Sequence, residues 1–411
     1  MYNKIRKYFD GIFARKIKFM RNECVAVLDI QSYNVTFLIG SKGVNGTFVV
    51  YDSESESYEG YFTEGFYDKE SFKRAVASVI SSVRQNYEGV VDEIYVGVPS
   101  AFIKVHTKGH TISFPSKRKI SAADVDMLFE SGLNELMATG RCIRRSGMYF
   151  SLADNRKCFQ EKDIYGVSSA SLKGALCYYF VEEEFYQEIL AVLRDLGIER
   201  VNFLPGSLAQ ALYLFPQKRR EGYAVLLDVG HLNSSISVVY GNGIVHQEAF
   251  DFGVGNILCS LMEKFQVDYE KAQEILAGAN ISGEVGKTEE WMDEDDDKYS
   301  VWQINDVIKC ALDELCEMVE KFFDKYYQKK QNDLFGGAVA ITGEGVESIV
   351  GIDKHVTNRI NRFTQIVSPE LPYYDKPVFS SRMALLEMAL GDCKKQTLLY
   401  RIFNFFGGKK K

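Results

Sequence analysis

The chain has 411 residues, more than one hydrophobic core usually serves, and its 46% hydrophobic and 26% charged residues are ordinary for globular proteins. A net charge of −7 gives no support for binding to nucleic acid. The eight cysteines form no CxxC pair, and no apolar run approaches the roughly 18–20 residues of a transmembrane helix. We therefore expect a cytoplasmic protein of two or more domains, without a zinc site or a disulfide framework.

The first predicted unit begins with a buried strand over residues 25–30, near whose end stands Asp29. A polar turn over 31–34 leads to a second strand, 35–39. A stretch rich in Gly and Asn then leads to a third strand around 47–51.

A segment of different character follows. Residues 94–118 alternate between polar and apolar side chains as strands do. A helix begins after Ser121, because a serine N-cap with the acidic Asp124 three positions on is a helix-start signal. Helical stretches over 68–87 and 182–196 flank this segment.

Residues 222–250 repeat the design of the first unit. A strand ends in Asp228, a turn follows over 230–234, and a second strand reaches Tyr240 before the hairpin turn Gly241-Asn242-Gly243 and a third strand. Self-similarity at about half the chain length indicates a duplicated domain rather than a short-period repeat.

The remainder of the chain is mostly helical. Helical residues 255–276 precede an acidic run over 289–297, interpreted as a solvated loop, and a long helix from about 303 to 328. A buried strand, 338–342, then runs into the turn Gly343-Glu344-Gly345.

Two Asp-tipped β-hairpins, a helix after the second and a late strand ending in a glycine turn resemble the actin/hexokinase/chaperone ATPase superfamily. Within it, the chain from about residue 23 to 392 resembles the bacterial cell-division protein FtsA. The matching segments are Leu28-Asp29-Ile30-Gln31-Ser32-Tyr33-Asn34, Ile120-Ser121-Ala122-Ala123-Asp124-Val125, Asp228-Val229-Gly230-His231-Leu232-Asn233-Ser234-Ser235, Gly253-Val254-Gly255-Asn256 and Ile341-Thr342-Gly343-Glu344-Gly345.

The resemblance implies an α/β, actin-like fold of two duplicated mixed-sheet domains with an FtsA-type inserted small subdomain. The implied division is a basic amphipathic segment, 1–22; a first domain core, 23–93 and 177–221, with returning helices about 352–392; the inserted subdomain, 94–176; a second domain core, 222–263 and 333–351; its small subdomain, 264–332; and a membrane-targeting tail, 393–411.

The resemblance also implies a nucleotide site between the domains. Its turns would close on the phosphates as anion-binding nests, and Asp29 and Asp228 would hold Mg²⁺ through water. The candidate cofactor-binding residues are Asp29, Gln31, Ser32, Asn34, Asp228, Gly230, Asn233, Gly253, Gly255, Gly343 and Gly345, and no residue is a candidate for catalysis.

The chain departs from the family pattern where phosphate, ribose and base would bind, at Gln31, Asn34, His231, Leu232, Ser235, Gln273, Leu276 and Glu344. Side chains replace open glycine backbone, and a carboxylate is lost at Ser235. We therefore expect weak or absent ATP hydrolysis rather than a competent ATPase, and leave open whether ATP and Mg²⁺ still bind. His231 is expected to face solvent rather than to act as a catalytic base.

Both ends of the chain are basic although the whole is acidic, which favours contact with an anionic surface. After a predicted break at Gly391-Asp392, the tail places apolar side chains on one helical face among basic ones, as in interfacial helices and as FtsA proteins characteristically end. The candidate membrane residues are Leu398, Leu399, Arg401, Ile402, Phe403, Phe405, Phe406, Lys409, Lys410 and Lys411. For residues 1–22, a second membrane contact and packing on the body stay equal alternatives.

The resemblance favours an FtsA-like adaptor of the cell-division machinery. Such a protein would tether FtsZ filaments to the inner face of the membrane at the division site and would assemble into actin-like polymers. The FtsZ C-terminal tail would dock on residues 264–332. Two alternatives are a PilM-like pilus-assembly scaffold, whose family generally lacks a basic tail, and an actin-fold small-molecule kinase, which needs a catalytic Asp that neither hairpin supplies.

Overall fold

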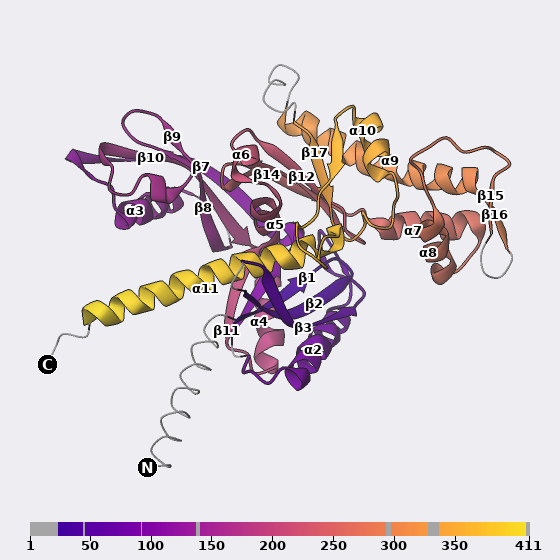
Figure 1. Ribbon diagram of the computed structural model, residues 1–411, viewed down its shortest axis with the longest axis horizontal. Helices are drawn as coiled ribbons and strands as arrows, with labels where there is room; N and C mark the ends of the chain where they lie inside the picture. The colour runs from indigo at the N-terminus through magenta and orange to yellow at the C-terminus, as the bar shows by residue number, and fades with distance from the viewer. Residues whose placement is uncertain are drawn as a thin grey trace, which may run out of the picture.

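The structure, a computed structural model, describes residues 24–43, 46–91, 93–136, 140–292, 297–327 and 337–407, with side chains described as far as Cys393 in the last helix. Two five-stranded sheets and a separate four-stranded sheet form its framework (Figure 1).

The first sheet has the strand order β11-β6-β1-β2-β3, with β1 antiparallel to β2 and parallel to β6. Its strands are β1 (Cys24–Ile30), β2 (Asn34–Lys42), β3 (Phe48–Ser57), β6 (Glu93–Val98) and β11 (Arg200–Pro205). Successive side chains of β1 enter two cores, because a pair of helices covers each face of the sheet. These pairs are α2 (Lys69–Asn86) with α4 (Glu183–Asp195), and α5 (Gly206–Leu214) with α11 (Ser380–Gly407).

The second sheet repeats this arrangement strand for strand. Its order is β14-β13-β12-β17-β18, with β12 antiparallel to β13 and parallel to β17. The strands are β12 (Ala224–Asp228), β13 (Ser234–Tyr240), β14 (Gly243–Phe250), β17 (Val339–Thr342) and β18 (Thr364–Ile366). One face packs on α7 (Val254–Phe265), α8 (Tyr269–Gly278), α9 (Val301–Tyr326) and α10 (Ile352–Ile360). The matching orders and directions agree with the duplication predicted from the hairpins.

Three expected assignments are wrong. Residues 94–98, assigned to the insert, form β6 in the middle of the first sheet, between β1 and β11. Helix α10 and strand β18 were assigned to the first domain, but α10 packs in the second core and β18 pairs with β17. The acidic run predicted as a loop is framed by a small hairpin, β15 (Glu290–Met292) and β16 (Lys298–Ser300), in which Trp291 faces Tyr299.

The inserted segment forms its own antiparallel sheet in the order β7-β10-β8-β9, with one helix packed on it. Its elements are β7 (Ile103–Lys119), α3 (Ala122–Asn134), β8 (Arg141–Ser151), β9 (Lys157–Cys158) and β10 (Ser168–Val181). The predicted helix start is confirmed, because Ser121 and Asp124 form a reciprocal capping box.

The insert packs closely against the hairpin of β13 and β14. Gly241 has φ +58°, and a Cβ there would lie 1.7 Å from the Met148 carbonyl oxygen of β8, so only glycine fits this turn. The buried Arg220 holds the turn from the other side by donating to the carbonyl of Gly241 at 2.9 Å and to the side chain of Asn242 at 2.9 Å.

The last helix, α11, is continuous from Ser380 to Gly407, so the predicted break at Gly391-Asp392 is wrong. Asp392 forms an ion pair with Arg144 of β8, and a helical glycine costs only about 1 kcal/mol. The start of the helix packs on the first sheet, and its C-terminal part extends away from both sheets (Figure 1). Among the described residues, no helix is long and apolar enough to cross a membrane.

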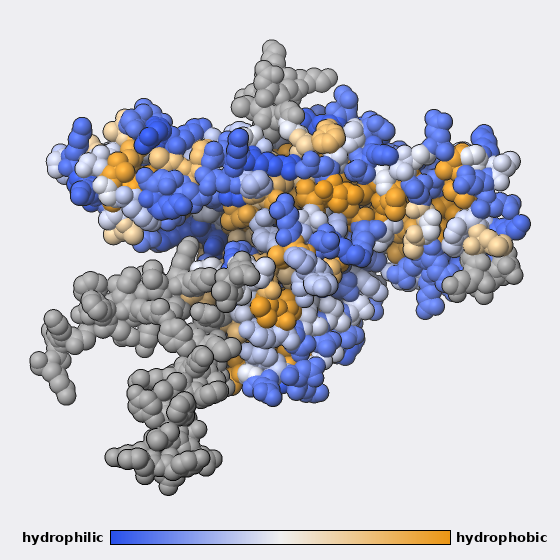
Figure 2. Space-filling view, viewed as in Figure 1, coloured by the Kyte–Doolittle hydropathy of each residue, from blue (hydrophilic) through white to orange (hydrophobic). Residues whose placement is uncertain are grey.

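Hydrophilic residues cover most of the visible face of the insert, whereas hydrophobic ones gather in a band across the second domain (Figure 2). Two aromatic side chains outside the cleft are well exposed, Phe363 just before β18 at 65% and Tyr373 in the loop before α11 at 92%. Such exposed side chains can be changed with little effect on the core, which makes them useful controls below.

Candidate functional site in the interdomain cleft

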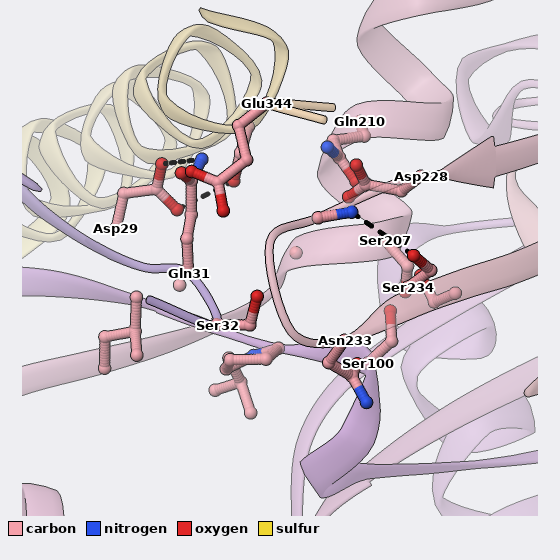
Figure 3. A pocket seen from close by; sticks show the side chains of 18 of the residues that line it. Asp29, Gln31, Ser32, Ser100, Ser207, Gln210, Asp228, Asn233, Ser234 and Glu344 are labelled. Atoms are coloured by element: carbon pink, nitrogen blue, oxygen red, sulfur yellow. Dashed lines mark hydrogen bonds between the residues drawn. The ribbon is translucent and has the colours of Figure 1, made fainter. Parts of the chain in front are cut away.

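The candidate site lies where the ends of β1 and β12 face each other (Figure 3). We call residues 31–33 after β1 the first turn, residues 229–233 after β12 the second turn, and residues 343–345 after β17 the late turn. Each follows a buried strand, and β17 lies beside β12, so all three meet at one cavity.

Asp29 is 1% exposed and is held by its neighbours. Its carboxylate accepts hydrogen bonds from Ser381 of α11 at 2.7 Å and from the Gln31 amide at 3.3 Å. Burial raises the pKa of Asp29, opposed by the nearby positive charge of Arg382. The first aspartate therefore binds the C-terminal helix in this structure.

Asp228 lies against the late turn and beside Gln210 of α5 (Figure 3). Gly343 has φ +109°, and a Cβ there would lie 2.3 Å from Asp228 Oδ1, so this position requires glycine for both conformation and space. Burial and the nearby Asp29 raise the pKa of Asp228 to about 6, against the lowering effect of Gln210.

The first and second turns bind each other directly across the cleft. The Leu232 backbone N–H donates to the Ser32 hydroxyl at 3.0 Å. The Leu232 side chain fills the space over Gly60, where an added Cβ would lie 2.3 Å from Leu232 Cδ1. The hydrogen bond thus joins the two turns, and the apolar contact joins the second turn to Gly60 of the first domain. Both contacts would have to break to admit a phosphate between the turns.

Glu344 of the late turn joins the other two turns. Its carboxyl accepts the backbone N–H of His231 at 3.0 Å and the side-chain amide of Asn34, the first residue of β2, at 3.0 Å. Burial, reinforced by the negative charges of Asp228 and Asp29, raises the pKa of Glu344 to about 7.

The expectation that His231 faces solvent is wrong. Its ring stacks on Tyr33 of the first turn, with centroids 4.3 Å apart and an interplanar angle of 24°. Tyr269 of α8 closes the group, since its hydroxyl lies 3.2 Å from His231 Nε2. Burial lowers the pKa of His231 to about 4, so the ring is neutral at physiological pH.

A further link closes the mouth of the cleft. Thr63, in the hairpin of β4 (Tyr61–Phe62) and β5 (Gly65–Phe66), donates its backbone N–H to Asp251 at 2.7 Å and its hydroxyl at 2.6 Å. Asn233 of the second turn donates to the same carboxylate at 3.0 Å. The first domain and the second are therefore bonded both inside the cleft and at its rim.

The nucleotide site that the resemblance implies is narrow in this structure and occupied by the protein's own side chains. The cavity measures about 60 Å³, which is small against the roughly 300–1,000 Å³ of ligand pockets. The donors of the second turn are already engaged, because the N–H groups of Gly230, His231 and Leu232 bind Ser234, Glu344 and Ser32. Among the described residues, no cluster of three or more metal-ligating side chains is present.

The first backbone N–H groups of α7 are also bonded within the protein, to carbonyls of the second turn. Val254 N–H donates to the Gly230 carbonyl at 3.1 Å, and Gly255 N–H donates to the His231 carbonyl at 2.8 Å. These are donors that a helix N-terminus offers to an anion when they are free. Gly253 packs on the His231 carbonyl, where a Cβ would lie at 2.2 Å from the oxygen. The glycines here serve close backbone packing.

The structure brings the predicted cofactor residues together at one place. The cavity is lined by Asp29, Gln31, Ser32, Asp228, Gly230 and Asn233, while Asn34, Gly253, Gly255, Gly343 and Gly345 lie in or against the three turns. The motifs did not point to Gln210, Ser381 and Asp251, which lie outside them. The side chains of the predicted membrane residues, 398–411, lie outside the described part, and their role stays a prediction.

No family model and no curated protein sequence matches the chain. Its structure is similar to the PilM–PilN type IV pilus biogenesis complex, with a TM-score of 0.58, 11% identity, and coverage of 89% of this chain and 98% of that one. It is also similar to MreB5 of Spiroplasma citri bound to ADP, with a TM-score of 0.54, 10% identity, and coverage of 91% and 99%. At these identities the likeness shows the fold alone. The chain has the actin-like fold that its sequence predicted.

We predict that the full chain neither binds nor hydrolyses Mg–ATP. The cavity is too small, and the second-turn donors are bonded to side chains of the protein itself. Calorimetric titration should give no saturable heat, and phosphate release should be no faster than for Asp228→Ala. Release near the ~1 s⁻¹ of ordinary enzymes, abolished in Asp228→Ala, would contradict this account.

We predict that stability falls as pH rises through the range in which Glu344 ionises. The folded protein holds this proton more tightly than the unfolded chain, because the pKa of Glu344 is raised from 4.5 to about 7. The stabilisation is complete below about pH 4.5 and lost above about pH 7, a change of roughly 3 kcal/mol at most.

Urea denaturation of wild type and Glu344→Gln across this pH range tests the prediction. Glu344→Gln should show a shallower decline. Glu347→Gln, changed at an exposed carboxylate that pairs with Lys376, should follow wild type. Equal slopes for all three proteins would show that Glu344 does not titrate in this range.

Proposed function

We propose that this chain is an actin-like scaffold, and specifically an FtsA-like adaptor that holds FtsZ filaments at the inner face of the membrane at the division site. The observation that carries a scaffolding role is the cleft closed by the protein's own side chains, with about 60 Å³ left inside. A kinase needs room for nucleotide and substrate, so this cleft disfavours the enzyme alternative.

The course of α11 supports attachment to a membrane. The helix runs without interruption from the cleft to Gly407 and extends from the domains at its C-terminal end (Figure 1). The sequence of that end combines Leu, Ile and Phe with Lys and Arg at helical spacing, which suits an anionic interface. In this proposal α11 is both a structural helix of the first domain and the anchor.

The second domain supplies the surface proposed to bind FtsZ. Residues 264–332 include α8, the β15–β16 hairpin and α9, whose apolar side chains share the core of the second sheet. Two large side chains of this region stay exposed, Met292 at 55% and Trp302 at 41%. An exposed Trp and Met are suited to anchor a short peptide.

A PilM-like pilus scaffold is the second candidate. The observation in its favour is the structural likeness to the PilM–PilN complex over 98% of that chain. The basic amphipathic tail is the feature that favours the FtsA-like proposal over it. Both candidates are scaffolds on the same fold, and self-assembly is proposed for either.

We predict that Phe403→Glu/Phe406→Glu releases the protein from anionic vesicles. Each buried Phe contributes apolar area at about 25 cal/mol per Å², and each added charge is repelled by the lipid surface. Flotation should fall about tenfold or more. The control Phe363→Glu/Tyr373→Glu, changed at two exposed positions outside the tail, should float like wild type. Undiminished flotation of the tail variant would remove the tail as anchor.

We predict that a peptide of the FtsZ C-terminal tail binds weakly and saturably. Trp302→Glu should weaken binding about tenfold, since a lost anchor is worth roughly 1–2 kcal/mol, whereas Phe363→Glu should not. Fluorescence anisotropy measures both. Saturable binding of a PilN peptide, without binding of the FtsZ peptide, would instead select the pilus-scaffold candidate.

A further inference from the structure

The position of Glu344 gives its carboxyl access to both domains. Gly343 brings the late turn against Asp228 and Val229, with an added Cβ only 2.3–2.4 Å from their oxygens. From this turn the Glu344 side chain points into the cavity between the two aspartates (Figure 3). No other glutamate lines the cavity, all of whose residues lie in the described ranges.

The two partners of Glu344 come from the two domains. One oxygen accepts the backbone N–H of His231 in the second turn, and the other accepts the side-chain amide of Asn34, beside the first turn. Backbone N–H groups of such turns are the usual donors to phosphate and other anions. A carboxyl oxygen of the protein therefore holds a donor that an external anion would need.

We propose that Glu344 is a built-in carboxyl ligand, whose oxygens take the acceptor position of a bound anion between the turns and hold the two domains closed without any external ligand. This inference goes beyond the proposed scaffolding role and is independent of which partner the scaffold binds.

The neighbours of Glu344 explain how the ligand is retained. Ser32 and Leu232 bond the first and second turns to each other at 3.0 Å. The stacked rings of Tyr33 and His231 and the hydroxyl of Tyr269 of α8 add further contacts around the His231 backbone that binds Glu344. The charged groups that face it are Asp29 and Asp228, with Arg382 beside Asp29. Because it is tethered by the chain, the carboxyl keeps its place beside these two acids.

Chemical rescue by a small carboxylate tests the assignment. Glu344→Ala removes the carboxyl, leaves the His231 N–H unpaired, and should lower the melting temperature by roughly 5 °C. Sodium formate, compared with sodium chloride at equal ionic strength, should recover at least half of that loss, because formate offers two acceptor oxygens of the same kind. Wild type, and Glu347→Ala as a matched variant of an exposed neighbour, should show no difference between the two salts.

Two results would overturn the proposal. One is a Glu344→Ala variant as stable as wild type, and the other is an equal effect of formate on Glu344→Ala and Glu347→Ala. If Glu344→Ala does not fold, Glu344→Gln keeps the volume and one acceptor oxygen but loses the charge. Hydrogen exchange at the His231 N–H should then be about tenfold faster than in wild type, and unchanged exchange would count against the carboxyl as the ligand of this N–H.

Discussion

The closed arrangement of the two domains depends on two neighbouring backbone N–H groups, those of His231 and Leu232. A buried N–H needs an acceptor, and in this chain the acceptors are the Glu344 carboxyl and the Ser32 hydroxyl. Since Ser32 belongs to the first domain and Leu232 to the second, and Glu344 also binds Asn34 of the first domain, satisfying these donors brings the domains together. The stacked Tyr33, the Leu232 contact over Gly60 and the Thr63–Asp251 bonds all depend on that closed geometry.

The same cleft is where the C-terminal helix is fixed. Ser380 bonds to Thr342 of β17 at 2.6 Å, and the next residue, Ser381, bonds to Asp29 of β1 at 2.7 Å. Helix α11 thus begins in contact with both sheets. It is about 40 Å long, at 1.5 Å per residue, and its far end carries the proposed membrane anchor. A protein whose cleft stays closed would hold this anchor at a fixed angle to both domains, which is a useful property for a scaffold.

Local patterns predicted much of the fold. The strands that carry Asp29 and Asp228 near their ends are continuous apolar runs followed by polar turn residues. The capping signal at Ser121 correctly predicted the start of the helix that follows. The errors have physical causes. Strand β6 is a short apolar run that leads directly into the alternating strand of the insert, and three-residue β18 is too short for a pattern. A glycine beside an aspartate resembles a helix end, but Arg144, far away in sequence, pairs with Asp392.

The chemistry of the site was less predictable than its location. The replaced glycines indicated a weakened nucleotide site, yet the bonds from Glu344 to Asn34 and from Ser32 to Leu232 join residues about 200 to 310 positions apart. Spacing along a chain carries no information on such contacts. His231 was expected in solvent for the same reason, because its partners Tyr33 and Tyr269 come from two other elements.

The most direct test of a cleft closed by its own side chains is the distance between the domains. Spin labels at Tyr67→Cys in the first domain and Val350→Cys in the second, both on exposed positions, would report it by electron–electron resonance once exposed Cys259 and Cys310 are changed to serine. The account predicts one narrow distance distribution that is the same without ligand, with Mg–ADP and with Mg–ATP. A broad distribution without ligand that narrows or shifts on adding Mg–ATP would contradict it.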